Sequence, residues 1–116
     1  MKAVDQGKLV IFDIDVQGHD IVRTKLDYLT TSVFITTPSL KELENRLNKR
    51  ATDSKDIIEK RISNSKIEIK SLDKYDYFIV NDDLKTAAQQ LTCVAHATML
   101  KSTIQDKDNL IKNWLN

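Results

Sequence analysis

The sequence of 116 residues predicts an α/β fold built on a parallel β-sheet. Three segments have the β-branched and aromatic composition of strands, and they lie at 8–15, 31–37 and 75–80. Between them, apolar residues recur at the spacings of three and four that are typical of helices. Strands that alternate with helices form parallel sheets. Such sheets usually have about five or six strands, so three is a small number.

The first predicted strand ends in two acids. Its apolar run, 9–12, is typical of a strand that is buried on both faces. Asp13 and Asp15 follow at the carboxyl end, where parallel sheets bind ligands, and residues i and i+2 of a strand share a face. The pair could therefore contact a metal or a substrate. Equally, acids end strands because they suit turns and helix caps, and the pattern leaves both interpretations open.

The middle of the chain is predicted to be mainly helical. A helix is expected over 20–26, before the second strand. Pro38 closes that strand, and Ser39 with Glu42 makes a capping box, so another helix starts there. A polar break then separates it from a long helix expected over about 55–71.

The last third begins with the strand at 75–80. Asp83 follows it and can cap the next helix. Cys93, the only cysteine, lies in an apolar helical stretch and is expected to be a buried thiol. A short terminal helix around 110–115 is expected to pack back on the rest.

Composition excludes several classes of function. The 18 basic and 17 acidic side chains leave a formal net charge of +1, which gives no reason to expect binding to nucleic acid or to a membrane surface. No apolar run approaches the roughly 18 residues that are needed to cross a bilayer, and a signal-peptide pattern is lacking. We therefore expect a cytoplasmic protein.

Some polar residues are candidates for binding phosphate or a nucleotide. The planar guanidinium groups of Arg46, Arg50 and Arg61 match phosphate oxygens, and a loop could bring them to a transferring phosphoryl group. The pattern alone favours the alternative, in which exposed arginines are solvated or paired with acids. Asn81 and Asp82 could contact a base or a ribose, although a helix cap is the favoured interpretation of that stretch.

The chain has only two glycines, Gly7 and Gly18. It therefore contains neither G-x-x-x-x-G-K-[ST] nor G-x-G-x-x-G, the patterns whose backbone cradles phosphate. No phosphate-cradling loop is therefore encoded in these 116 residues.

Four motifs occur in a characteristic order. The first is Asp-Ile-Asp-Val-Gln-Gly at 13–18, and the second is Pro-Ser-Leu at 38–40 with the helical run 42–47. The third is Arg-Ala-Thr-Asp-Ser at 50–54, with Arg61 eleven residues after Arg50. The fourth is Tyr-Asp-Tyr-Phe-Ile-Val-Asn-Asp-Asp at 75–83. Over about residues 2–95 the chain thereby resembles the carboxyl-terminal part of guanylate kinase, the family that transfers phosphate from ATP to GMP.

The resemblance implies roles in a lid at about 46–61. Arg50 and Arg61 would be the catalytic lid arginines that clamp the ATP phosphates and stabilise the charge on the transferring group. Arg46 would be a supporting ATP-binding residue. Ala51 stands where the family usually has glycine, which would stiffen the lid backbone without removing a functional side chain.

The resemblance also implies contacts outside the lid. Asn81 and Asp82 would contact the adenine side of ATP. Asp13 and Asp15 would lie beside GMP and the Mg²⁺ that accompanies ATP, with Asp13 the indirect metal contact.

The resemblance further implies what the chain does not contain. In the family, the P-loop and most of the GMP-binding residues precede the strand at 8–15, and the P-loop strand lies between that strand and the one at 31–37. We therefore expect an incomplete P-loop nucleoside-monophosphate-kinase-like fold without its central strand, a truncated chain that is inactive alone. An amino-terminal half or a second copy would complete the sheet.

Two domain assignments and two functions follow. Residues 1–95 would be the carboxyl-terminal part of a guanylate kinase-like domain, and 96–116 a helical tail. The first functional interpretation is a segment of the enzyme. The alternative is a non-catalytic guanylate-kinase-like module that binds other proteins.

Overall fold

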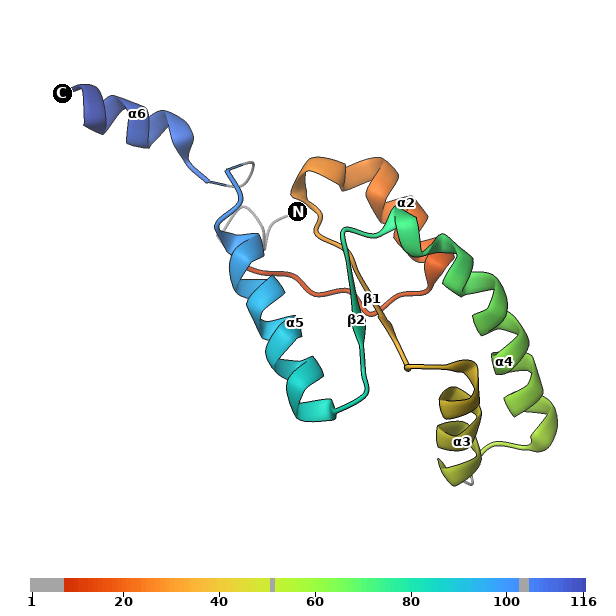
Figure 1. Cartoon of the computed structure of the whole chain (residues 1–116). Coiled ribbons are helices and arrows are strands. Elements are labelled where there is room, and N and C mark those ends of the chain that lie inside the picture. The colour runs from red at the N-terminus through yellow and green to blue at the C-terminus, as the bar shows by residue number, and fades with distance from the viewer. Residues whose placement is uncertain (1–7, 51, 103–104) are drawn as a thin grey trace. The chain divides into compact units, whose positions relative to one another are not determined.

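The computed structural model describes residues 8–50, 52–102 and 105–116 (Figure 1). The chain divides into two compact units. One is Ser32–Gln90, and the other joins Met1–Thr31 with Leu91–Asn116. The sheet belongs to the first of these units.

The sheet has two parallel strands, β1 (Val33–Thr36) and β2 (Tyr77–Val80) (Figure 1). Val33 is opposite Tyr77 at one end of the register, and Thr36 is opposite Val80 at the other. The α/β class and the parallel pairing are thereby confirmed. The described part of the chain, however, has two strands rather than the expected three.

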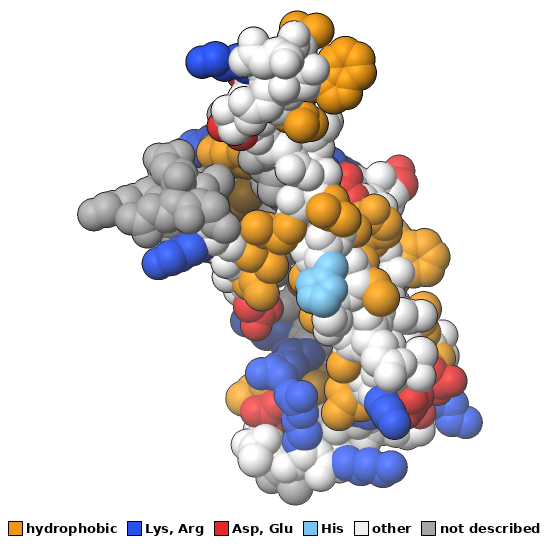
Figure 2. All heavy atoms as spheres, turned by 90° about the vertical axis from the view of Figure 1, so that its left-hand side faces the viewer, with side chains coloured by type: hydrophobic (Ala, Val, Ile, Leu, Met, Phe, Trp, Pro, Cys, Tyr) orange, Lys and Arg blue, Asp and Glu red, His pale blue; other side chains and the backbone are white. Residues whose placement is uncertain are grey.

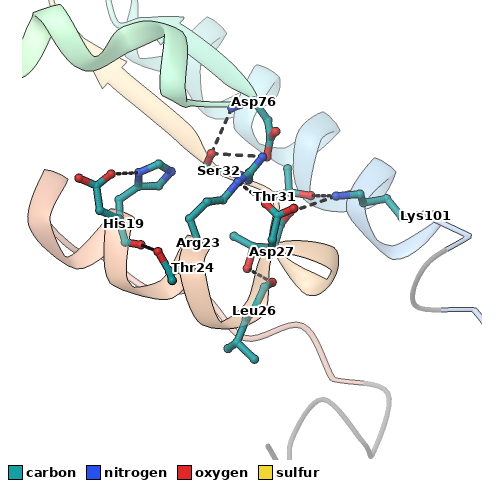
Figure 3. Close-up of polar contacts among 11 residues, drawn as sticks. His19, Arg23, Thr24, Leu26, Asp27, Thr31, Ser32, Asp76 and Lys101 are labelled. Carbon is teal, nitrogen blue, oxygen red and sulfur yellow. Dashed lines mark hydrogen bonds and ion pairs between the residues drawn. The ribbon is translucent and has the colours of Figure 1, made fainter.

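Hydrogen bonds between Ser32 and Asp76 hold the two strands together at their amino ends (Figure 3). The Ser32 backbone N–H donates to Asp76 Oδ2 at 2.8 Å, and the Asp76 N–H donates back to Ser32 Oγ at 3.1 Å. The Tyr77 N–H then donates to the Ser32 carbonyl at 3.0 Å. Because a slip of one residue would separate these partners, the contacts fix the register of the sheet.

Two contacting helices, α3 (Leu40–Arg50) and α4 (Lys55–Glu68), follow β1 in sequence. The 3₁₀ helix η2 (Ile69–Lys74) succeeds α4, so the long helix predicted over 55–71 ends as an α-helix at residue 68. The unit has a small apolar core. Its buried side chains are Leu47 of α3, Ile58 of α4, Ile79 of β2 and Ala87 of α5.

The predicted helix start at Ser39 is confirmed. Ser39 Oγ accepts a hydrogen bond from the Glu42 N–H at 3.1 Å. The Glu42 carboxylate does not complete the capping box, because it pairs with Arg46 instead. Ser54 begins α4 in the same way, with Oγ accepting from the Ile57 N–H at 3.4 Å.

Helix α5 (Leu84–Met99) begins after Asp83, as predicted. The Thr86 hydroxyl and backbone N–H both donate to Asp83 Oδ2, at 2.7 and 3.1 Å. These hydrogen bonds, the one from the hydroxyl first, hold the pKa of the Asp83 carboxyl below its ordinary value. Asp83 therefore caps α5 as a carboxylate.

The other unit contains α2 (Val16–Leu26), the 3₁₀ helix η1 (Asp27–Leu29) and α6 (Lys107–Leu115). Lys101 Nζ donates to the Thr30 carbonyl at 3.1 Å and to Thr31 Oγ1 at 3.0 Å (Figure 3). Among the described residues, no helix has both the length and the apolar character that a membrane crossing requires.

Helix α2 starts at residue 16 rather than at 20, because Asp15 caps it. Asp15 Oδ1 accepts from the Gly18 N–H at 2.7 Å. A Cβ at Gly18 would lie 3.1 Å from Ile14 Cβ and 3.3 Å from Asp15 Oδ1. A residue without a side chain therefore suits this crowded first turn.

The prediction of a buried strand at 8–15 is wrong. This segment has no regular structure before the Asp15 cap, and Ile11 is 80% exposed. A strand requires a neighbour that exchanges backbone hydrogen bonds with it. The described residues give this run no such neighbour, so its apolar composition alone does not make it a strand.

Two further expectations of burial are wrong. Cys93 is exposed. At about 100° per residue it lies roughly 240° around α5 from the buried Ala87.

The terminal helix does form, as α6, but its apolar side chains do not pack back, and Trp114 is 80% exposed. Figure 2 shows hydrophobic side chains at several places on the face that it draws.

Replacing Asp76 with alanine should loosen the amino end of the sheet, because the buried Ser32 N–H loses its acceptor. We expect the Ser32 and Tyr77 amides to exchange with deuterium about 10-fold faster or more, since an unsatisfied buried group costs roughly 1–3 kcal/mol. The matched control is D73A, which removes an exposed acid three residues earlier. Unchanged amide exchange in D76A would contradict the conclusion that the Ser32–Asp76 hydrogen bonds hold the strands together.

The cap of α5 should make stability depend on pH. Because the folded pKa of Asp83 is lowered, its stabilising contribution is complete above the unfolded value of 3.8 and is lost as the pH falls through the folded pKa. Melting of the wild type and of D83N, which keeps an uncharged cap, should therefore differ most near neutral pH. The advantage of the wild type should disappear in acid, and a constant difference would reject this origin.

Candidate functional site

The carboxyl ends of β1 and β2 form a tightly bonded edge. The Asn81 N–H donates to the Thr36 carbonyl at 2.7 Å, directly beyond the last paired residues. The Asp82 N–H donates to the Val80 carbonyl at 3.0 Å, which turns the chain toward α5. Parallel sheets bind ligands at this edge. The backbone of the two predicted adenine contacts is therefore held in place.

Arg46 connects α3 to this edge. Its Nε donates to Glu42 Oε1 at 2.9 Å, and its Nη1 donates to the Asn81 carbonyl at 2.7 Å. The side chain is 33% exposed. The interpretation that this arginine pairs with an acid is thus confirmed, and the structure adds a bond to the strand end.

The other two arginines lie farther along the arm formed by α3 and α4. Arg50 is the last residue of α3 and is exposed. Arg61 lies within α4, and its Nη1 is 3.6 Å from Asp53 Oδ2. Ala51 lies outside the described residues. In addition to the anchored Arg46, the described part of the arm therefore carries two exposed arginines.

Asp13 and Asp15 belong to the other unit, and they do not act as an equivalent pair. The Asp15 carboxylate caps α2, so the alternative of a helix cap is confirmed for this residue. Asp13 is exposed in irregular chain. The argument that both share one strand face is wrong, because the segment is not a strand. Asp13 is the acid whose carboxylate is not used in a cap.

A metal site made by protein ligands alone is not found. Within residues 8–50, 52–102 and 105–116, no three His, Cys, Asp or Glu side chains gather at a place where they could hold a metal ion. Mg²⁺ usually binds one or two carboxylates together with substrate phosphates and water. An exposed carboxylate such as Asp13 fits that mode.

Sequence reasoning missed three partners. Glu42 lies four residues before Arg46, a helical spacing that could have indicated the ion pair. In the sequence, Asp53 belongs to the motif at 50–54 and Asp76 to the predicted strand at 75–80, and neither position by itself indicates a partner. Their contacts, with Arg61 and Ser32, cross turns and strands, and no local spacing indicates them.

The parallel strands β1 and β2, joined through helices α3 and α4 and contacted at their carboxyl edge by Arg46, define an α/β protein. A family model described as guanylate kinase matches residues 1–98. The chain therefore belongs to the guanylate kinase family, which confirms the resemblance seen in its motifs.

Curated guanylate kinases are similar to nearly the whole chain. That of Sulfurimonas denitrificans is 46% identical over 113 residues, 97% of this chain and 55% of that protein. That of Wolinella succinogenes is 44% identical over 112 residues, with shares of 97% and 52%. That of Helicobacter pylori is 39% identical over 115 residues, with shares of 99% and 55%. The chain thus spans about half the length of the curated relatives it matches.

Replacing Arg46 with lysine should weaken the link between α3 and the sheet, because an ammonium group cannot present a planar fork to two acceptors. We expect the free energy of unfolding in urea to fall by about 1 kcal/mol. Hydrogen bonds to charged groups contribute somewhat more than this when buried, and the partial exposure of Arg46 reduces the contribution. E42Q keeps an oxygen acceptor and the Asn81 contact, so it should cost less. An equal loss in both variants would show that the Asn81 carbonyl contributes little.

Proposed function

We propose that this chain is the lid-bearing part of a guanylate kinase, which transfers the γ-phosphate of ATP to GMP and gives ADP and GDP. The observation that carries the proposal is the family match over residues 1–98 together with the arginines of the arm. A cytoplasmic location, where both nucleotides occur, belongs to the same proposal.

Arg50 and Arg61 are proposed to hold the ATP phosphates. Both guanidinium groups are exposed, so they can reach a ligand. Each fork can donate two parallel hydrogen bonds to phosphate oxygens. In the reaction, a GMP phosphate oxygen bonds to the γ-phosphorus while the bond from the γ-phosphorus to the bridging oxygen of ADP breaks. The arginines would stabilise the charge on the equatorial oxygens during this exchange.

The remaining predicted residues are proposed to position the nucleotides. Asn81 is well placed to present its side chain to adenine, because its backbone is bonded to both Thr36 and Arg46. Asp82 is exposed beside it. The Mg²⁺ that accompanies ATP would neutralise phosphate charge, and Asp13 is the acid proposed to lie near it.

A second segment is proposed to supply the phosphate-binding loop. The 116 residues contain no glycine-rich pattern of that kind. In addition, the apolar run 9–12 has no strand partner among the described residues. A family amino-terminal half, or less directly a second copy, is proposed to complete the sheet.

The test is GDP formation from ATP, Mg²⁺ and GMP by the 116-residue chain, alone and mixed with the amino-terminal half of the Sulfurimonas denitrificans enzyme. We expect turnover only in the mixture. R50A or R61A should then lower kcat by about 10²–10³-fold, the loss typical for a group that stabilises transition-state charge. The matched controls K49A and K60A each remove the adjacent cation and should keep wild-type turnover.

Full turnover by the chain alone would contradict the need for a second segment. No turnover in either case, combined with tight binding of a phosphopeptide without nucleotide, would replace the enzyme by the protein-interaction module.

A further inference from the structure

We infer that Asp53 is a positioning residue that orients Arg61 for the phosphates. The inference rests on the proposed function. Asp53 Oδ2 lies 3.6 Å from Arg61 Nη1, with the aspartate side chain 21% and the arginine side chain 51% exposed. The acid is therefore the more buried member of the pair, and the cation faces solvent.

The direction of the Arg61 side chain explains why it meets this acid. Long side chains on a helix lean toward its amino terminus, which for α4 is the Ser54 cap. The residues one turn away from Arg61 on α4 are Ile57, Ile58, Asn64 and Ser65, none of which is acidic. The acid that lies beside Arg61 is instead Asp53, which directly precedes Ser54 at the start of the helix.

The start of α4 holds Asp53 in place. Ser54 Oγ accepts from the Ile57 N–H at 3.4 Å, and the Ser54 carbonyl accepts from the Ile58 N–H at 3.1 Å. The Ile58 side chain is buried. The peptide that carries Asp53 is thus joined to an anchored first turn, and a fixed acid can orient a long flexible cation.

The pair is suited to orientation rather than to permanent binding. A separation of 3.6 Å is longer than a hydrogen bond, and half-exposed ion pairs are weak. A guanidinium has five N–H donors, so phosphate oxygens can accept two charge-assisted hydrogen bonds from Arg61 while the carboxylate stays beside Nη1. Asp53 also reduces the repulsion between Arg50 and Arg61 if both converge on the same phosphates.

The test is a double-mutant cycle of D53N with R61A in the mixture of chain and amino-terminal half, followed with radiolabelled ATP. D53N should lower kcat about 2- to 5-fold, the factor that corresponds to the interaction energy of an exposed ion pair. It should leave the KM for GMP unchanged. In the R61A background D53N should have no further effect, because it acts through Arg61. D53E should keep wild-type kcat, and so should the matched control D56N, which removes an exposed acid from the first turn of α4.

Each other result contradicts a stated claim. Additive losses in the cycle would make Asp53 merely structural, and wild-type kcat in D53N would give it no role, so either result rejects this inference alone. A mixture that is inactive with wild-type chain would reject the proposed function itself, and this inference with it.

Discussion

The parallel pairing of β1 with β2 is the constraint on which the Ser32–Gln90 unit depends. Two strands of four residues each offer little backbone bonding of their own. Additional hydrogen bonds therefore join the strands at both ends. Ser32 and Asp76 are bonded at the amino ends, and Thr36 and Asn81 at the carboxyl ends. A shift of the strand register by one residue would break the hydrogen bonds at both ends and turn the buried Ile79 to the other face of the sheet.

The same register determines where the arm is attached. Arg46 reaches the Asn81 carbonyl only because β2 ends opposite the end of β1, from which the chain leads into α3. Arg46 thus belongs to the framework, while Arg50 and Arg61 lie farther along the arm and are exposed. Such an arrangement suits the binding of a charged ligand by Arg50 and Arg61. Arg46 fixes the base of the arm, while the other two arginines remain accessible.

Features that depend on neighbouring residues could be predicted, and features that depend on distant ones could not. The caps at Ser39 and Asp83 follow from side chains within three residues, and both are found. The bond from Arg46 to Asn81 joins residues 35 positions apart, and nothing in the local pattern indicates it. The motifs predict the candidate arginines, but they do not indicate that Arg46 pairs with Glu42 or that Arg61 lies beside Asp53.

The run 9–12 shows why composition alone misleads about strands. Its residues have the apolar character of a doubly buried strand, yet Ile11 is almost fully exposed in the described chain. Burying one large aliphatic side chain is worth about 1.5–3 kcal/mol, and none of that is gained here for Ile11. β1 likewise pairs on one side only among the described residues. Each of these two features, taken by itself, is what a strand-like segment shows when no neighbouring strand exchanges backbone hydrogen bonds with it.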